Sequence, residues 1–139
     1  MSRDQDRVQR FHSGGPWETE VGYSRAIRVG DRVLVSGTTA ARGDEAIPDD
    51  AGDQARLALE TIEHALEQAG SELRDVIRTR VFVVDLPANG SAVLSAYGEA
   101  LRGARPTIST LGVAALVDPR LKVEIEVEAI VGAGAVYEG

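Results

Sequence analysis

Cysteine is absent from this chain of 139 residues. Disulfide bonds, thiolate nucleophiles and cysteine-ligated metal centres are therefore excluded. Aromatic residues make up only 4% of the sequence, with Trp17 as the single tryptophan, while 43% of residues are hydrophobic. A chain of this length forms one domain with a sizeable core, so we expect a single domain over residues 1–139.

Positive charge is also scarce, with 15 basic against 22 acidic residues and a formal net charge of −7. Nucleic-acid-binding surfaces need clustered lysine and arginine, so we expect no nucleic-acid partner. No apolar run is long enough to cross a membrane, and the polar first sixteen residues lack the apolar segment of a secretory signal. We therefore expect no membrane partner and a cytoplasmic location.

Histidine is limited to His12 and His64. Glu60 and His64 are one helical turn apart, a spacing that two metal ligands can use, but the sequence offers no third ligand nearby. The Gly132-Ala133-Gly134 run follows the last expected strand and has no helix after it to receive a pyrophosphate. We expect neither a metal nor a cofactor.

Periodicity predicts an alternation of strands and helices along the chain. A turn at Gly30-Asp31 joins the first two expected strands, and Gly70 is expected to end the first helix. The expected elements are strands 25–29 and 32–36, a helix from about Asp50 to Gln68, strand 76–84, a helix from about Ser91 to Leu101, and two closing strands separated by Asp118-Pro119. This order predicts an α+β fold, a single sheet with two helices packed on one face. Residues 1–16 are expected to be a loosely ordered arm and 132–139 a flexible tail.

The last strand, Lys122 to Ala129, alternates apolar and acidic residues. The alternation predicts that the apolar residues face the core and that Glu124, Glu126 and Glu128 share the opposite face. On strand 76–84, Arg78 and Arg80 share one face, and we expect them to offset part of this acidic stripe.

Several segments, taken in order, resemble the RidA/YjgF family of enamine and imine deaminases. The sequence Val21-Gly22-Tyr23-Ser24-Arg25-Ala26 is similar to the family's GPYSQA-like motif, and Val33-Leu34-Val35-Ser36-Gly37 to its strand ending in SG. Residues 75–86 are similar to the family's "VVKTTVFVKDL" strand, and Tyr97 and the VEIE run at 123–126 complete the match. The resemblance extends from about Gly22 to Val131. It implies a mixed sheet of the chorismate-mutase-like type and a homotrimer with small-molecule clefts between subunits.

The chain departs from the family where the deaminases carry an arginine in a P-A-R-[ST] motif. Alignment on Pro106 places Ile108 at that arginine, and Leu94 stands where the family has an asparagine. Arg105 lies three residues earlier, which on an extended strand reverses the face and shifts the side chain by about 10 Å. A guanidinium grips a substrate carboxylate with two hydrogen bonds, whereas isoleucine has no such donors. The Ile108 and Leu94 pair therefore predicts a neutral, more apolar ligand.

The resemblance also suggests roles for individual residues. Glu124 matches the family's catalytic-site glutamate, a general base that activates water, although it also fits a purely structural acidic stripe. Tyr23 matches the cleft tyrosine, or packs with a polar tip exposed. Trp17 forms either an aromatic wall of the cleft or an anchor for the N-terminal arm. Thr110 offers a hydroxyl to a ligand, or bonds solvent or backbone.

Three functions remain open from the sequence. The first is a divergent enzyme that acts on a neutral imine, enamine or related metabolite by using Glu124 and Tyr23. The second is a small-molecule binding or regulatory trimer without catalysis. The third is a 2-imino acid deaminase in which Arg105 replaces the missing arginine.

Overall fold

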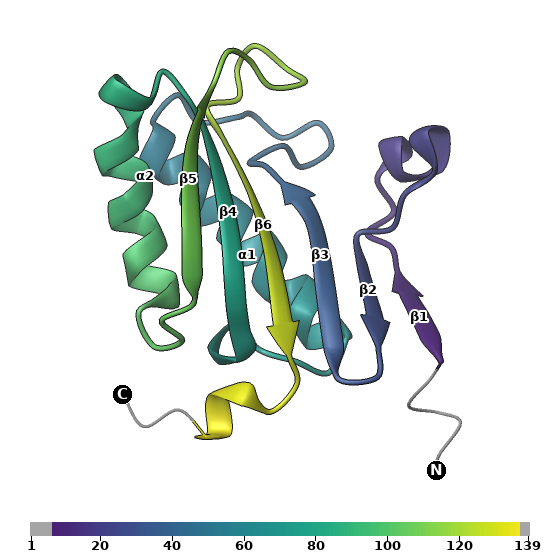
Figure 1. The fold of residues 1–139 in the computed structure, drawn as a ribbon. Helices are drawn as coiled ribbons and strands as arrows, with labels where there is room; N and C mark the ends of the chain where they lie inside the picture. Colours follow the sequence, from purple (N-terminus) through teal and green to yellow (C-terminus); the bar gives the residue numbers. More distant parts are fainter. Residues whose placement is uncertain (1–6, 137–139) are drawn as a thin grey trace.

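The protein is built on a single six-stranded sheet, seen in a computed structural model that describes residues 7–136 (Figure 1). The strands are β1 (Val8–Phe11), β2 (Ala26–Val29), β3 (Arg32–Thr38), β4 (Val76–Val84), β5 (Thr107–Val113) and β6 (Val123–Ile130), in the order β1-β2-β3-β6-β4-β5. Among the strands of residues 7–136, only β4 and β5 pair in parallel, so the sheet is mixed. Helices α1 (Ala51–Gln68) and α2 (Leu86–Leu101) cover one face (Figure 1). The predicted α+β architecture is confirmed.

Helix α1 begins and ends where its sequence signals predict. The side chain of Asp50 accepts a hydrogen bond of 2.9 Å from the backbone N–H of Asp53, which satisfies a free donor of the first turn. At the other end Gly70 has a φ of +83°, a left-handed conformation that favours glycine. The expected helix from about Asp50 to Gln68 is therefore confirmed.

The core lies between the two helices and the sheet and is aliphatic. Its fully buried members include Ile62 and Leu66 of α1, Val81 and Val83 of β4, and Ile125 of β6. The apolar residues of β6 face the helices, so the alternating glutamates lie on the opposite face. No helix of the described residues covers that second face (Figure 1).

Helix α2 begins at Leu86, five residues before the expected start at Ser91. The side chain of Asp85 accepts from the N–H of Ala88, and Pro87 lies in the first turn, where a missing N–H costs nothing. Gly90 lies inside the helix and is buried against the side chain of Leu86. The turn-forming residues at 89–91 therefore led to a predicted start of the helix that is five residues too late.

The expectation of loose order at the two ends is corrected for two short segments. Strand β1 lies within the expected N-terminal arm and pairs antiparallel with β2. Within the expected tail, Ala133–Val136 forms a short helix, η4, and the N–H of Gly134 donates to Asp75 at 3.0 Å. Residues 1–6 and 137–139 of the two segments lie outside the described residues. Within 7–136, no helix combines the length and apolarity needed to cross a membrane.

Candidate functional site

The face of the sheet away from the helices carries the acidic stripe of Glu124, Glu126 and Glu128. In register, β4 places Phe82, Arg80 and Arg78 opposite these three glutamates. The side chain of Arg80 forms an ion pair of 2.5 Å with Glu126. Glu128 pairs at 3.0 Å with Arg32 of β3. The predicted offset of the stripe by basic residues is confirmed for Arg80, whereas Glu128 takes its direct partner from the other neighbouring strand.

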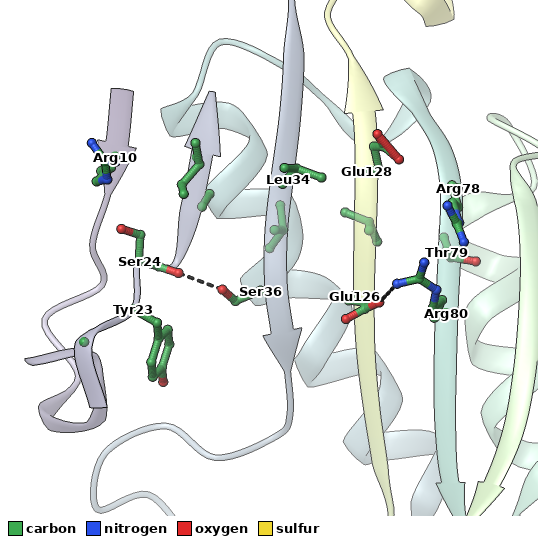
Figure 2. A pocket seen from close by; sticks show the side chains of 15 residues that line it. Arg10, Tyr23, Ser24, Leu34, Ser36, Arg78, Thr79, Arg80, Glu126 and Glu128 are labelled. Carbon is green, nitrogen blue, oxygen red and sulfur yellow. Dashed lines mark hydrogen bonds and ion pairs between the residues drawn. The ribbon is translucent and has the colours of Figure 1, made fainter. Parts of the chain in front are cut away.

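A groove of about 660 Å³ lies on this face. Figure 2 shows side chains from β1 to β4 and β6 around it, with the Arg80–Glu126 ion pair on one side and the hydrogen bond between Ser24 and Ser36 on the other. Its polar lining comprises Arg10, Tyr23, Ser24, Ser36, Arg78, Thr79, Arg80, Glu126 and Glu128. Apolar side chains also line it, those of Ala26, Ile27, Leu34, Val35 and Val127, so the groove is an open surface of mixed polar and apolar character.

The carboxyl group of Glu124 occupies the space that a side chain at Gly37 would fill. Strand β3 has an irregularity here, because its register with β6 shifts between Val35 and Thr38. A Cβ atom built on Gly37 would lie 2.8 Å from Cδ of Glu124 and 3.1 Å from each carboxylate oxygen. The bulge in β3 and the absence of a side chain at Gly37 together make room for Glu124.

Burial raises the pKa of Glu124, and the negative charge of Glu126 raises it further. The positive charge of Arg25 opposes both effects without reversing them. The side-chain carboxyl group of Glu124 makes no hydrogen bond or ion pair among residues 7–136. A carboxyl group with a raised pKa and no fixed partner is suited to taking and returning a proton.

Arg25 is a site residue that the sequence did not single out. Its Nη2 donates a hydrogen bond of 2.8 Å to the carbonyl of Gly37, and its guanidinium carbon lies 6.0 Å from the centre of the Tyr23 ring. Burial lowers the pKa of Arg25, against the charges of Tyr23, Glu18 and Glu124. Its buried Nε has no hydrogen-bond partner among the described residues. The signal was present in the sequence, since Arg25 stands where the GPYSQA-like motif has glutamine.

Ile108, which aligns with the family's arginine, and its neighbour Thr110 lie on the helix-covered face of the sheet. In register, Ile108 and Thr110 of β5 are beside Thr79 and Val81, which are buried beneath the helices. Ile108 is 43% exposed because β5 is an edge strand, and Leu94 on the neighbouring helix α2 is 40% exposed. Within one chain Ile108 and Thr110 therefore lie on the opposite face of the sheet from Glu124.

The remaining candidates are exposed. Arg105 has a φ of +51° in the turn between α2 and β5, and its side chain has no hydrogen bond or ion pair within residues 7–136. It precedes Thr107, which is level with Glu128, whereas Glu124 is level with Leu111, roughly 13 Å further along β5. Trp17 is 59% exposed at the start of the short helix η2 (Glu18–Gly22). The lining of the groove includes neither Arg105 and Trp17 nor Glu124 and Arg25.

In the described part of the chain, no cluster of three or more histidine, aspartate or glutamate residues is placed to hold a metal ion. Glu60, which shares a helix turn with His64, instead forms an ion pair of 3.3 Å with Arg42. The chemistry available at the site is therefore that of a carboxyl group, a guanidinium and a phenol.

The chain is similar in sequence and in fold to proteins of one known family. A family model described as Endoribonuclease L-PSP matches residues 16–131. An uncharacterized protein of Streptomyces coelicolor is 39% identical, over 92% of this chain and 96% of its own length. A 2-iminobutanoate/2-iminopropanoate deaminase of Salmonella typhimurium is 34% identical, over 78% of this chain and 84% of its own. A crystal structure from Mycobacterium tuberculosis, of a member of the YjgF/YER057c/UK114 family, superposes with a TM-score of 0.83 at 42% identity, over 90% of this chain and all of that one.

Proposed function

This chain belongs to the RidA/YjgF family, and we propose that it hydrolyses a small neutral imine or enamine by an acid/base step at Glu124. The observation that carries the proposal is the Glu124 carboxyl group, which lies against Gly37 with a raised pKa and no fixed partner. Relatives named as deaminases support the same class of reaction.

The proposed reaction needs one proton acceptor that later becomes a donor. Glu124 takes a proton from water as the water oxygen attacks the imine carbon, which forms a carbinolamine. Glu124 returns this proton to the nitrogen, which completes the neutral carbinolamine. It then transfers the hydroxyl proton of the carbinolamine to the nitrogen as the C–N bond breaks, so that the products are a carbonyl compound and ammonia or an amine and Glu124 is again a carboxylate. Tyr23, 36% exposed beside the Arg25 guanidinium, would line the edge of the site.

An assembly is needed to complete this site. Glu124 and Tyr23 are associated with the open face of the sheet, whereas Ile108, Thr110 and Leu94 belong to the β5–α2 edge of the helix-covered layer. We propose a homotrimer in which that edge of one subunit lies against the open face of the next. Exposed Leu34 and Leu111 on the open face favour such burial, because apolar side chains gain from leaving water.

The proposed ligand is neutral because the Ile108 and Leu94 group offers it no cation. Burial of a carboxylate beside such residues without a partner costs several kcal/mol, on the order of 2–7 kcal/mol even for a neutral polar group. Ile108 and Leu94 would instead contact an uncharged, apolar part of the ligand. Trp17, which is 59% exposed at the start of η2, would provide an aromatic wall of the assembled cleft.

The family model's description as an endoribonuclease does not lead us to propose RNA cleavage. The chain carries a net charge of −7, and three glutamates line up along β6 on the open face. A polyanion would meet repulsion from these carboxylates, and nucleic-acid binding draws most of its affinity from clustered basic residues.

The test compares two classes of imine that are generated in the assay by oxidases. An amine oxidase supplies uncharged imines and an amino-acid oxidase supplies imines that carry a carboxylate; semicarbazide traps whatever remains. We expect the wild-type protein to accelerate decay of the uncharged imine and Glu124→Gln to abolish this effect. Full activity in a folded Glu124→Gln variant would refute the proposed role.

Two further variants separate the alternatives. Ile108→Arg should gain at least tenfold activity on the carboxylate imine, because a charge-assisted hydrogen bond contributes about 1.5–3 kcal/mol. If the wild type already prefers that imine and Arg105→Ala abolishes the activity, the protein is a 2-imino acid deaminase that uses Arg105. If neither imine decays faster but both protect the protein against thermal unfolding, the trimer binds without catalysis.

A further inference from the structure

Three hydrogen bonds tie the segment before β2 to the bulge in β3. The N–H of Ser36 donates to the carbonyl of Arg25 at 3.0 Å, and the hydroxyl of Ser36 donates to the carbonyl of Ser24 at 2.7 Å. The Arg25 side chain closes the arrangement by donating from Nη2 to the carbonyl of Gly37 at 2.8 Å. Arg25 is thus the one side chain of this segment that fixes Gly37 from outside β3 in the described structure.

The position of Gly37 in turn determines where the Glu124 carboxyl group lies. The carboxyl group fits against Gly37 with no space for an additional carbon atom. A shift of the bulge towards β6 would displace the carboxyl group, and a shift away would open space behind it. The chain of contacts therefore runs from the Arg25 guanidinium through the Gly37 carbonyl to the Glu124 carboxyl group.

Arg25 also determines the charge that Glu124 experiences. From β6 itself, Glu124 faces the like charge of Glu126, whose own cation, Arg80 of β4, is engaged in an ion pair. Its register partner on β4 is Phe82, which is uncharged, and its neighbour on β3 is Gly37. Tyr23 and Glu18 act electrostatically on Arg25. Arg25 is the cation whose charge lowers the proton affinity of Glu124.

We infer that Arg25 is a positioning residue, which holds the Ser36–Gly37 bulge and places its charge so that Glu124 stays in position and ionised for proton transfer. This inference rests on the proposed function of Glu124. It also agrees with a neutral ligand, because the carboxylates of Glu18 and Glu124 already act on the Arg25 guanidinium and its Nη2 donates to a protein carbonyl. Arg25 thus serves the base rather than the substrate.

The experiment is a titration of side-chain carboxyl groups by carbon-13 NMR on the full-length chain. The Glu124 signal is identified by its loss in Glu124→Gln. Two neutral variants, Arg25→Gln and Arg25→Met, should both raise the pKa of Glu124, whereas Arg25→Lys, which keeps the charge, should leave it closer to the wild-type value. The use of two neutral variants guards against failure of one to fold.

Arg28→Gln is the matched control. Arg28 also lies at β2 and donates to two backbone carbonyls, those of Gly30 and Ala69, each at 2.8 Å. Its removal should lower stability without changing the pKa of Glu124. An unchanged pKa in the folded neutral variants of Arg25, or an equal rise in Arg28→Gln, would overturn the inference.

Kinetics supply a second readout where turnover is found. The acid limb of the pH profile of kcat/KM should move to higher pH in Arg25→Gln and return towards wild type in Arg25→Lys. The two proposals fail in different ways. If Glu124→Gln retains activity, the proposed function fails, while the NMR result alone decides whether Arg25 controls the ionisation of Glu124.

Discussion

Replacement of Gly37 by alanine tests whether the Glu124 carboxyl group must lie where the structure places it. The new Cβ atom would be 2.8 Å from Cδ of Glu124, whereas carbon atoms in contact are about 3.5–4.0 Å apart. The carboxyl group must therefore move by about 1 Å. Gly37 does not have a positive φ, so alanine takes up the same backbone conformation without strain.

The expected losses of stability and of activity differ widely. The displaced atoms are the end of a flexible side chain, so we expect the free energy of unfolding to fall by less than about 1 kcal/mol. A displacement of about 1 Å in a reacting group lowers the rate by about 100-fold, or about 2.7 kcal/mol in the barrier. Gly37→Ala should therefore be a stable protein with little activity.

The assay measures the second-order rate of imine decay beside the melting temperature. Gly103→Ala is the control, because Gly103 follows α2 with nothing within 4 Å of its added Cβ atom and without a positive φ. We expect wild-type activity from this control. Wild-type activity in folded Gly37→Ala would refute the argument that the gap at Gly37 positions Glu124. A large fall in melting temperature would show instead that the bulge is chiefly structural.

Three further predictions concern assembly and stability. Leu34→Glu, on the open face, should reduce the mass measured by light scattering from that of a trimer to that of a monomer, whereas Val117→Glu, at a position 83% exposed, should not; an unchanged mass for Leu34→Glu would contradict burial of this face. Burial would raise the pKa of Asp75, but hydrogen bonds from Gly134, Ser71, Gly132 and Glu72 outweigh it and lower the pKa. The stabilisation from Asp75 is therefore complete above the ordinary aspartate pKa and is lost as the pH falls below it. Asp75→Asn should lower the free energy of unfolding in urea by about 2 kcal/mol at pH 7 and by much less in acid. An equal loss at both pH values would be inconsistent with this linkage. Gln54 is fully buried; its side chain donates to the carbonyls of Pro48 and Arg120 and accepts from the N–H of Lys122. Gln54→Leu should therefore lower the free energy of unfolding by about 2–3 kcal/mol. An unchanged melting temperature would show that these three backbone groups find other partners.

The elements that the sequence predicted well are those specified by local patterns. Strand β6 follows from its period-two alternation, and α1 from a helical period with a cap at Asp50 and a terminating Gly70. Strand β1 was missed because it is only four residues long, is mostly exposed and does not alternate apolar and polar residues. It forms through an antiparallel hydrogen-bonded ladder with β2, and no pattern within residues 8–11 predicts this pairing.

The candidate site shows the same division. The alternation on β6 places Glu124 on the open face from sequence alone. The contact of Glu124 with Gly37 and the role of Arg25 depend on a bulge in β3. A bulge interrupts the alternation of a strand and leaves no repeating sequence pattern from which it could be predicted. Alignment identified Ile108 and Leu94 as replacements, but it could not show that they lie across the sheet from Glu124 in one chain.

The structure also offers a reason why Glu124, rather than another member of the acidic stripe, would carry the chemistry. Glu126 and Glu128 each have a direct ion pair, with Arg80 and Arg32, so the carboxylates of both residues are held by a fixed partner. Glu124 lacks such a pair in the described part of the chain, since the nearby guanidinium of Arg25 donates to the carbonyl of Gly37 instead. A stripe of three similar residues is thus divided into two structural ion pairs and one partly buried carboxyl group that can exchange a proton. That difference in partners, rather than the spacing of the three glutamates, supports Glu124 as the proposed base.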